Sequence, residues 1–184
     1  EGMRRANTGG EYLPGDQAGP VLAGLITTNN VQVTFVAFAG GIAFGIGTVL
    51  ALVFNGVAAV GAGVGLYITR GIEGQILGFV AAHGLLELAA IAIAGGGGLL
   101  LGTALLLPGD RTRREALVAN GLRALHLIGC STLFLLVAGV IEGNVSPARL
   151  PNEVKYGVAV LTAVAMVAYL WPREAARVTT PPAP

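Results

Sequence analysis

Long apolar stretches separated by short polar ones run through most of the chain. From Gln17 to Thr69 there is no Asp, Glu, Lys or Arg, and a helix that crosses a bilayer needs about 20 apolar residues. Further apolar stretches cover residues 76–94, 99–107, 121–141 and 156–171, and charged residues gather between them. The pattern predicts an all-α, polytopic transmembrane helical protein.

Polar segments divide the chain into four expected parts. Residues 1–17 form a polar lead-in, interpreted as the end of a longer N-terminal region, and residues 18–30 an interfacial amphipathic helix. This helix can also be interpreted as the first turn of the next one. Residues 31–171 form the transmembrane domain, with a first span at 31–53, a turn at Asn55-Gly56 and a short apolar segment at 57–68. Residues 172–184 form a disordered, proline-rich tail.

The run Gly95-Gly96-Gly97-Gly98 decides how many times the chain is expected to cross. Glycine disfavours a helix by about 1 kcal/mol per residue relative to alanine, which favours a break there. If the run is only a kink, there are five crossings, and the basic residues divide five against six across the membrane. If the chain reverses, only Arg149 and Lys155 stay outside, and nine basic residues lie inside with both termini.

The nine-to-two division agrees with the positive-inside rule, whereas five against six shows no asymmetry. We therefore predict six glycine-rich passages, two of them short or re-entrant, with both termini in the cytoplasm. The short passages need shielding by protein, because broken backbone cannot face lipid.

Composition excludes several classes of function. Charged residues make up 11% of the chain and mean hydropathy is +0.74, against roughly 25% charged residues in ordinary domains. A net charge of +1 argues against a nucleic-acid surface, and a single cysteine, Cys130, excludes an intrachain disulfide. The nucleophile motif G-x-S-x-G, the zinc motif H-E-x-x-H and a phosphate loop are absent from the sequence. We expect no enzyme activity and no cofactor.

Glycine accounts for 29 of the 184 residues, and several glycines stand four apart. Small residues at this spacing let helix backbones approach closely in a bilayer. Packing within one chain and packing between copies both fit the pattern, and we expect a homo-oligomer. The residues assigned to helix packing are Gly41, Gly45, Gly61, Gly65, Gly95, Gly96, Gly97, Gly98 and Gly102.

His83 and Glu87 form the main polar pair within the apolar stretches, and their spacing of four places them on one helical face. The pair could be a structural hydrogen-bonded pair, part of a proton or ion path, a partner-binding site or part of a metal site. We expect both side chains to be buried and bonded to Asn30, Asn55 or Glu142. A zinc site needs a third ligand, which Glu142 provides only if its span ends beside that of His83. No metal is expected. The candidate polar residues are Asn29, Asn30, Asn55, His83, Glu87 and Glu142.

A series of short motifs resembles the stage II sporulation protein M family. It begins with Thr28-Asn29-Asn30, Phe38-Ala39-Gly40-Gly41, Gly45-Ile46-Gly47-Thr48 and Asn55-Gly56. Its strongest stretch, His83-Gly84-Leu85-Leu86-Glu87-Leu88, is followed by the glycine run, Leu107-Pro108-Gly109, Arg114, Ile141-Glu142-Gly143 and Ser146-Pro147. Each motif is unspecific alone, but their order and spacing over residues 4–171 are specific.

The resemblance implies an integral protein of the bacterial inner membrane. In spore formers the family member anchors a complex with a peptidoglycan hydrolase and a lytic transglycosylase. We therefore expect a non-enzymatic membrane scaffold for cell-envelope or peptidoglycan remodelling, with lipid, further copies and envelope enzymes as partners and no nucleic acid. The alternatives are a channel or transporter with a polar path through His83, Glu87 and Glu142, and an intramembrane metalloenzyme.

Overall fold

The computed structural model describes residues 15–171 apart from residues 72, 147 and 149. This part of the chain is helical, which confirms the all-α prediction. Its elements are α1 (Gly15–Ala39), η2 (Gly40–Ile42), α2 (Ile46–Phe54), η3 (Asn55–Gly61), α3 (Ala62–Thr69), α4 (Glu73–Leu106), α5 (Arg113–Asn144) and α6 (Asn152–Leu170). The expected tail at 172–184 and residues 1–14 of the expected lead-in lie outside the described residues.

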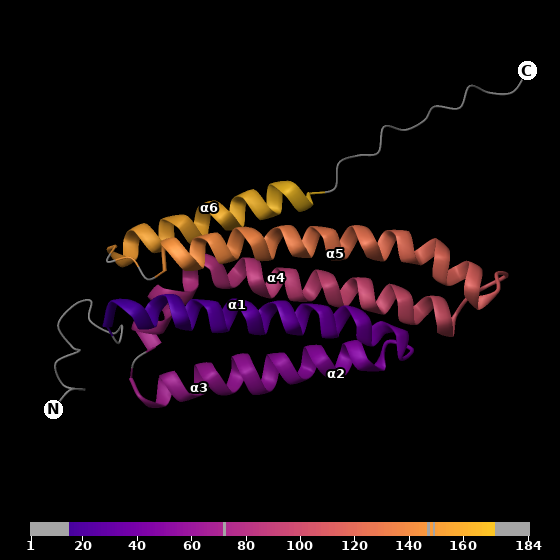
Figure 1. The fold of residues 1–184 in the computed structure, drawn as a ribbon, viewed down its shortest axis with the longest axis horizontal. Helices are drawn as coiled ribbons and strands as arrows, with labels where there is room; N and C mark the ends of the chain where they lie inside the picture. The colour runs from indigo at the N-terminus through magenta and orange to yellow at the C-terminus, as the bar shows by residue number, and fades with distance from the viewer. Residues whose placement is uncertain (1–14, 72, 147, 149, 172–184) are drawn as a thin grey trace, which may run out of the picture.

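The helices lie alongside one another and alternate in direction (Figure 1). The segments α2, η3 and α3 follow each other as one rod, in which η3 is a π-helical stretch. The central element is α4, which packs against α1, α2, α5 and α6. The start of α1 lies at one end of the bundle, and α6 ends about midway along it.

Among the residues that the structure describes, four helical segments are long and apolar enough to cross a membrane: Ile46–Leu66, Leu77–Leu106, Arg113–Asn144 and Asn152–Leu170. The outer surface carries many large apolar side chains; Phe54, for example, is 73% exposed and Leu161 is 69% exposed. An aqueous exterior would disfavour so much apolar area, whereas lipid accepts it. The exterior of this bundle therefore fits a bilayer.

The prediction that the chain reverses at residues 95–98 is wrong. The helix α4 runs without a break from Glu73 to Leu106, through all four glycines. Residues 99–107 are therefore no separate returning helix, and the nine-to-two division of basic residues, which depended on the reversal, no longer applies. The low helix propensity of the glycines is overridden because several of them allow neighbouring backbone or side chains to approach closely.

Three other expected boundaries also differ from the structure. The predicted span 31–53 is interrupted, since α1 ends at Ala39 and α2 begins at Ile46. The predicted turn at Asn55-Gly56 is instead the start of η3, which continues the rod toward α3. The division expected at residue 30 between an interfacial helix and a span falls inside α1, which is one helix from Gly15 to Ala39.

The turn between α1 and α2 packs directly on the glycine run of α4. A Cβ atom on Gly41 would overlap the carbonyl oxygen of Gly98, and one on Gly98 would lie 2.5 Å from the carbonyl oxygen of Ala37. A Cβ on Gly102 would lie 2.6 Å from the backbone nitrogen of Gly45. Gly45 also has a φ of 81°, a left-handed conformation that favours glycine. Only glycine permits this turn to approach α4 so closely.

Side-chain hydroxyls also connect neighbouring helices. Ser131 of α5 donates to the carbonyl oxygen of Ala90 on α4 at 2.7 Å, and Thr48 of α2 donates to that of Ala37 on α1, also at 2.7 Å. Ala90 belongs to the apolar core, together with Phe134 and Leu135 of α5. Such interhelical bonds satisfy polar groups that lipid cannot.

Gly98 and Gly96 provide a matched pair for testing the close contact. A Cβ on Gly98 would overlap its neighbours, whereas one on Gly96 would have nothing within 4 Å. Gly98→Ala should destabilise the protein by roughly 1–3 kcal/mol through overpacking, while Gly96→Ala should leave stability unchanged or raised, because alanine favours the helix. Thermal unfolding in detergent measures both, and a Gly98→Ala protein as stable as the wild type would contradict the packing.

The continuous α4 also predicts the topology of its two flanking turns. Arg70 precedes α4 and Asp110 follows it, and a helix of 34 residues is about 51 Å long, which exceeds the roughly 30 Å of a bilayer core. Single cysteines Arg70→Cys and Asp110→Cys, in a Cys130→Ala background, should therefore react with an impermeant thiol reagent from opposite faces of the membrane. A reversal inside α4 would place both on the same face.

Candidate functional site

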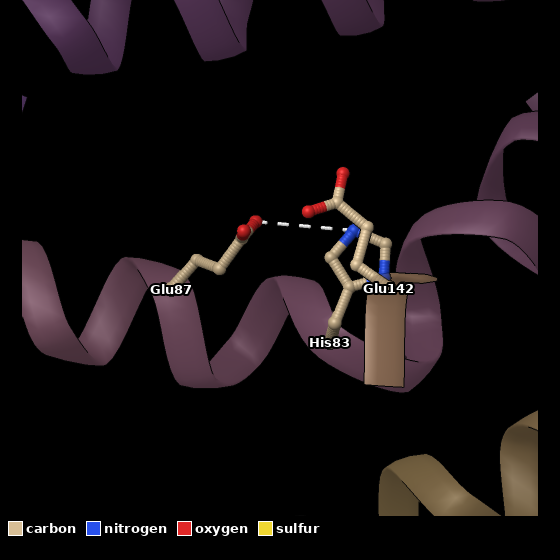
Figure 2. A group of neighbouring side chains, drawn as sticks. All are labelled: His83, Glu87 and Glu142. Carbon is tan, nitrogen blue, oxygen red and sulfur yellow. Dashed lines mark ion pairs between the residues drawn. The ribbon is translucent and has the colours of Figure 1, made fainter. Parts of the chain in front are cut away.

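A buried group of His83, Glu87 and Glu142 lies between α4 and α5 (Figure 2). His83 and Glu87 project from successive turns of α4, and Glu142 comes from the last turns of α5. One ligand atom from each residue lies within 4.8 Å of the other two. Their exposed fractions are 1%, 5% and 0%. The structure thus places together the three residues that the sequence pattern considered for a trio.

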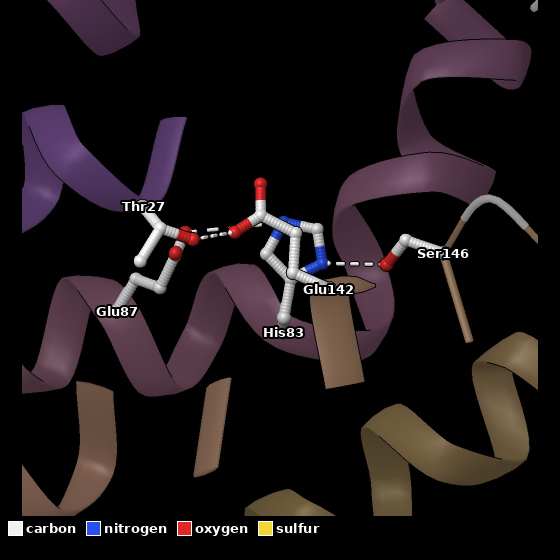
Figure 3. A network of polar contacts seen from close by, with 5 residues as sticks. All are labelled: Thr27, His83, Glu87, Glu142 and Ser146. Atoms are coloured by element: carbon white, nitrogen blue, oxygen red, sulfur yellow. Dashed lines mark hydrogen bonds and ion pairs between the residues drawn. The ribbon is translucent and has the colours of Figure 1, made fainter. Parts of the chain in front are cut away.

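Further polar side chains surround this group, and Figure 3 shows two of them, Thr27 and Ser146. Nδ1 of His83 lies 2.8 Å from Oγ of Ser146, which follows α5. The hydroxyl of Thr27, on α1, donates to Oε2 of Glu142. The side chain of Asn30, one turn further along α1, lies beside Glu87. Three helices therefore contribute to the site.

Two buried polar atoms of the group have no hydrogen-bond partner in the part of the chain that the structure describes. Nε2 of His83 and Oε1 of Glu142 are buried, and neither has a hydrogen-bond partner among the described residues. Nε2 lies 3.9 Å from Oε2 of Glu87, which exceeds hydrogen-bond length. Buried polar atoms without partners are rare in folded proteins, so these two atoms call for a physical explanation.

Lys155 is a buried cation bonded beside Ser146, but among the described residues it forms no ion pair with either carboxylate. Its ammonium donates to the backbone carbonyl oxygen of Ser146 at 2.8 Å, and the residue is 9% exposed. Lys155 thereby fixes the segment after α5 that positions the Ser146 hydroxyl against His83. The ring of Phe79 packs edge-on to the imidazole, with ring centroids 5.9 Å apart, and closes another side.

In space, Ser146, His83 and Glu87 follow one another as a nucleophile, a base and an orienting acid do in a catalytic triad. The serine–imidazole distance of 2.8 Å fits that arrangement, but the imidazole–carboxylate distance of 3.9 Å does not. Ser146 is also only 1% exposed, which leaves its hydroxyl covered. The arrangement is better suited to holding a small charged species than to attacking a substrate.

The remaining polar candidates lie apart from this group or beside it. Asn30 is half-buried at Glu87, whereas Asn29 is exposed on α1. Asn55 is buried at the start of η3. His126 is exposed, and its ring lies 2.7 Å from the carbonyl oxygen of Leu122. Cys130 packs partly buried against the apolar core.

The glycines assigned to helix packing fall into two groups. Those near the turn between α1 and α2 have close neighbours: Gly41, Gly45, Gly95, Gly97, Gly98 and Gly102. A Cβ on Gly96 or Gly65 would have nothing within 4 Å, and one on Gly61 would meet only Gly56 of the same rod. The close contacts thus gather on α4 and its partners, away from α3.

Sequence reasoning did not assign Thr27, Ser146 or Lys155 to the site. Thr27 begins the polar stretch Thr27-Thr28-Asn29-Asn30, and Ser146 belongs to the motif Ser146-Pro147, so both were visible as polar positions beside apolar ones. Lys155 was visible only as a basic residue near a span. Their roles depend on how α1, α5 and α6 pack around α4, which a single sequence does not show.

The chain matches a known protein family along most of its length. The sequence model of the family described as stage II sporulation protein M matches residues 5–147, a range that includes Thr27, His83, Glu87, Glu142 and Ser146. Neither the curated proteins nor the solved structures contain a match to this chain. With the buried group and the apolar helices around it, the match shows that this membrane protein belongs to the stage II sporulation protein M family.

Proposed function

We propose that this chain is a non-enzymatic scaffold of the bacterial inner membrane that crosses the bilayer several times and positions proteins of cell-envelope or peptidoglycan remodelling. Family membership supports a membrane role. The observation that carries the proposal is the contrast between a closed centre and two open apolar flanks. In the most apolar 18-residue stretch of each segment, the buried share is 6% in Ile46–Leu66 and 0% in Asn152–Leu170. The corresponding share in α4 is 50%.

The closed centre supports a scaffold over a channel. Around α4 the backbones of Gly41 and Gly98 are in direct contact, and Ala90, Phe134 and Leu135 fill the region between α4 and α5. The polar group of His83, Glu87 and Glu142 is enclosed among these helices instead of continuing as a polar path. A rigid centre of this kind maintains the relative positions of helices on its outside.

The two flanks supply the surfaces for partners. The rod from α2 to α3 and the helix α6 lie on opposite sides of the centre (Figure 1). Phe54 on the first flank and Leu161 on the second are largely exposed. Within a bilayer, transmembrane helices of partner proteins and of further copies of this chain pack on such faces through van der Waals contact. We propose that envelope proteins and further copies use these flanks.

Photo-crosslinking in living cells tests the scaffold. We expect a photoreactive phenylalanine at Phe54 or Leu161 to give protein adducts, both with a second copy and with envelope enzymes identified by mass spectrometry. Leu107 is a suitable control, because it is 79% exposed but lies beyond the end of α4, outside both flanks. Adducts with lipid alone at both flank positions would contradict the proposal, as would equal protein adducts at Leu107.

A further inference from the structure

We propose that His83, Glu87 and Glu142 bind one divalent transition-metal ion of the zinc class between α4 and α5. The ion would be held by Nε2 of His83 and one oxygen of each carboxylate. This inference concerns a bound ion and no reaction, and it is independent of the scaffold role.

The spacing of the three ligand atoms fits a metal ion after small side-chain movements. Zinc binds imidazole nitrogen and carboxylate oxygen at about 2.0–2.2 Å, so two ligands of a tetrahedral site are about 3.4 Å apart. The three atoms now lie within 4.8 Å of one another. Side-chain movements that shift each ligand atom by about 1 Å would therefore be enough to place an ion between them. The fourth coordination position would be filled by water.

Two buried atoms of the group lack partners among the described residues, and one of them, Nε2 of His83, is the imidazole atom that an ion would bind. Nε2 of His83 and Oε1 of Glu142 are both buried and without a hydrogen-bond partner, in residues that are 1% and 0% exposed. When the Nδ1 hydrogen donates to Ser146, the lone pair of Nε2 points toward the carboxylates. Lone pairs that face one another repel, whereas a cation between them converts the repulsion into coordination.

The charges also balance. Two ionised carboxylates carry a charge of −2, which a divalent ion neutralises, so that the buried group becomes neutral as a whole. The nearby cation, Lys155, is bonded to a backbone carbonyl oxygen and does not neutralise either carboxylate. Burying an unpaired charge is costly, and proteins avoid that cost by pairing it or by coordinating a metal.

The surroundings of the three residues resemble the outer shell of a metal site. A histidine that binds a metal almost always donates its other ring N–H to a neighbouring acceptor, and ligating carboxylates are themselves hydrogen-bonded. Here Ser146 lies at Nδ1 of His83, Thr27 donates to Glu142, and Asn30 reaches Glu87. Every candidate ligand thus has a polar neighbour of its own, and Nε2 of His83 faces Glu87 without a hydrogen-bond partner in the described part of the chain.

The donor set indicates the class of metal. An imidazole favours zinc, iron, copper or nickel, whereas all-oxygen sites favour magnesium or calcium. One imidazole with two carboxylates therefore favours zinc, iron or manganese over magnesium and calcium. Bound between α4 and α5, with Thr27 of α1 on its outer side, the ion would hold three helices together at one end of the bundle.

Metal analysis of the full chain in detergent is the direct test. The protein is purified through an affinity tag without histidine, stripped with chelator, incubated with Zn²⁺ alone and freed of excess metal. We expect about one equivalent of retained zinc, and Co²⁺ should give the visible absorption of a low-symmetry site. Zn²⁺ at 100 times its Kd should raise Tm by roughly 5–10 °C, while Mg²⁺ should not.

Conservative variants distinguish this site from adventitious binding. Glu87→Gln and Glu142→Gln keep the side-chain shape but remove the charge, and both should abolish zinc retention and the zinc-dependent rise in Tm. The controls Glu153→Gln and His126→Gln alter an exposed carboxylate and an exposed imidazole, and should retain zinc like the wild type. Ser146→Ala should weaken zinc binding by about 10–100-fold without abolishing it.

The outcomes separate metal binding from a purely structural network. A stripped wild-type protein that folds but retains less than about a tenth of an equivalent of zinc, cobalt or manganese would overturn the proposal. Equal zinc retention in Glu142→Gln and in the wild type would overturn it as well. If Glu142→Gln fails to fold, the wild-type measurements of stoichiometry, cobalt absorption and Tm still decide the question.

Discussion

The contact between the glycines of α4 and the turn joining α1 to α2 is the constraint on which the arrangement of this protein depends. Gly41 lies against Gly98 and Gly45 against Gly102, with no room for a Cβ atom at Gly41, Gly98 or Gly102. The turn can occupy this place only if α4 continues past it as a regular helix. The glycine run, whose composition predicts a break, thus lies within a continuous helix and forms the surface on which the turn between α1 and α2 packs.

A continuous α4 in turn sets the register of α5. Gly97 lies near the backbone of Ala124, and Ala90 accepts a hydrogen bond from Ser131. These two contacts are seven residues apart along both antiparallel helices, which is two helical turns. One further step of seven along each helix brings His83 opposite the fully buried Ala138, and Glu142 lies one turn beyond it. The buried group is therefore a consequence of how α4 and α5 pair along their length.

The sequence was sufficient to predict the features that depend on local pattern. Apolar stretches predicted an all-α fold, and the spacing of His83 and Glu87 placed both on one face of a helix. The turn at residues 95–98 was predicted wrongly because helix propensity is a local quantity, of about 1 kcal/mol per glycine, and tertiary contact outweighs it. For the same reason the polar neighbours Thr27 and Ser146 could not be assigned, since helices distant in sequence bring them to the group.

The same close packing explains why polar groups can be concentrated at one end of a largely apolar bundle. Where α4 meets α5 near its middle, Ser131 satisfies its hydroxyl on a backbone carbonyl oxygen, and alanine and phenylalanine fill the remaining space. Toward the start of α4, α1 and α5 approach with Thr27, Asn30 and Glu142 on their inner sides. There the polar side chains contact one another, as Thr27 does Glu142 and His83 does Ser146. A rigid glycine contact at one end of α4 and a polar group at the other thus fix the helix at two points, and the lateral faces of α6 and of the rod from α2 to α3 remain free of both.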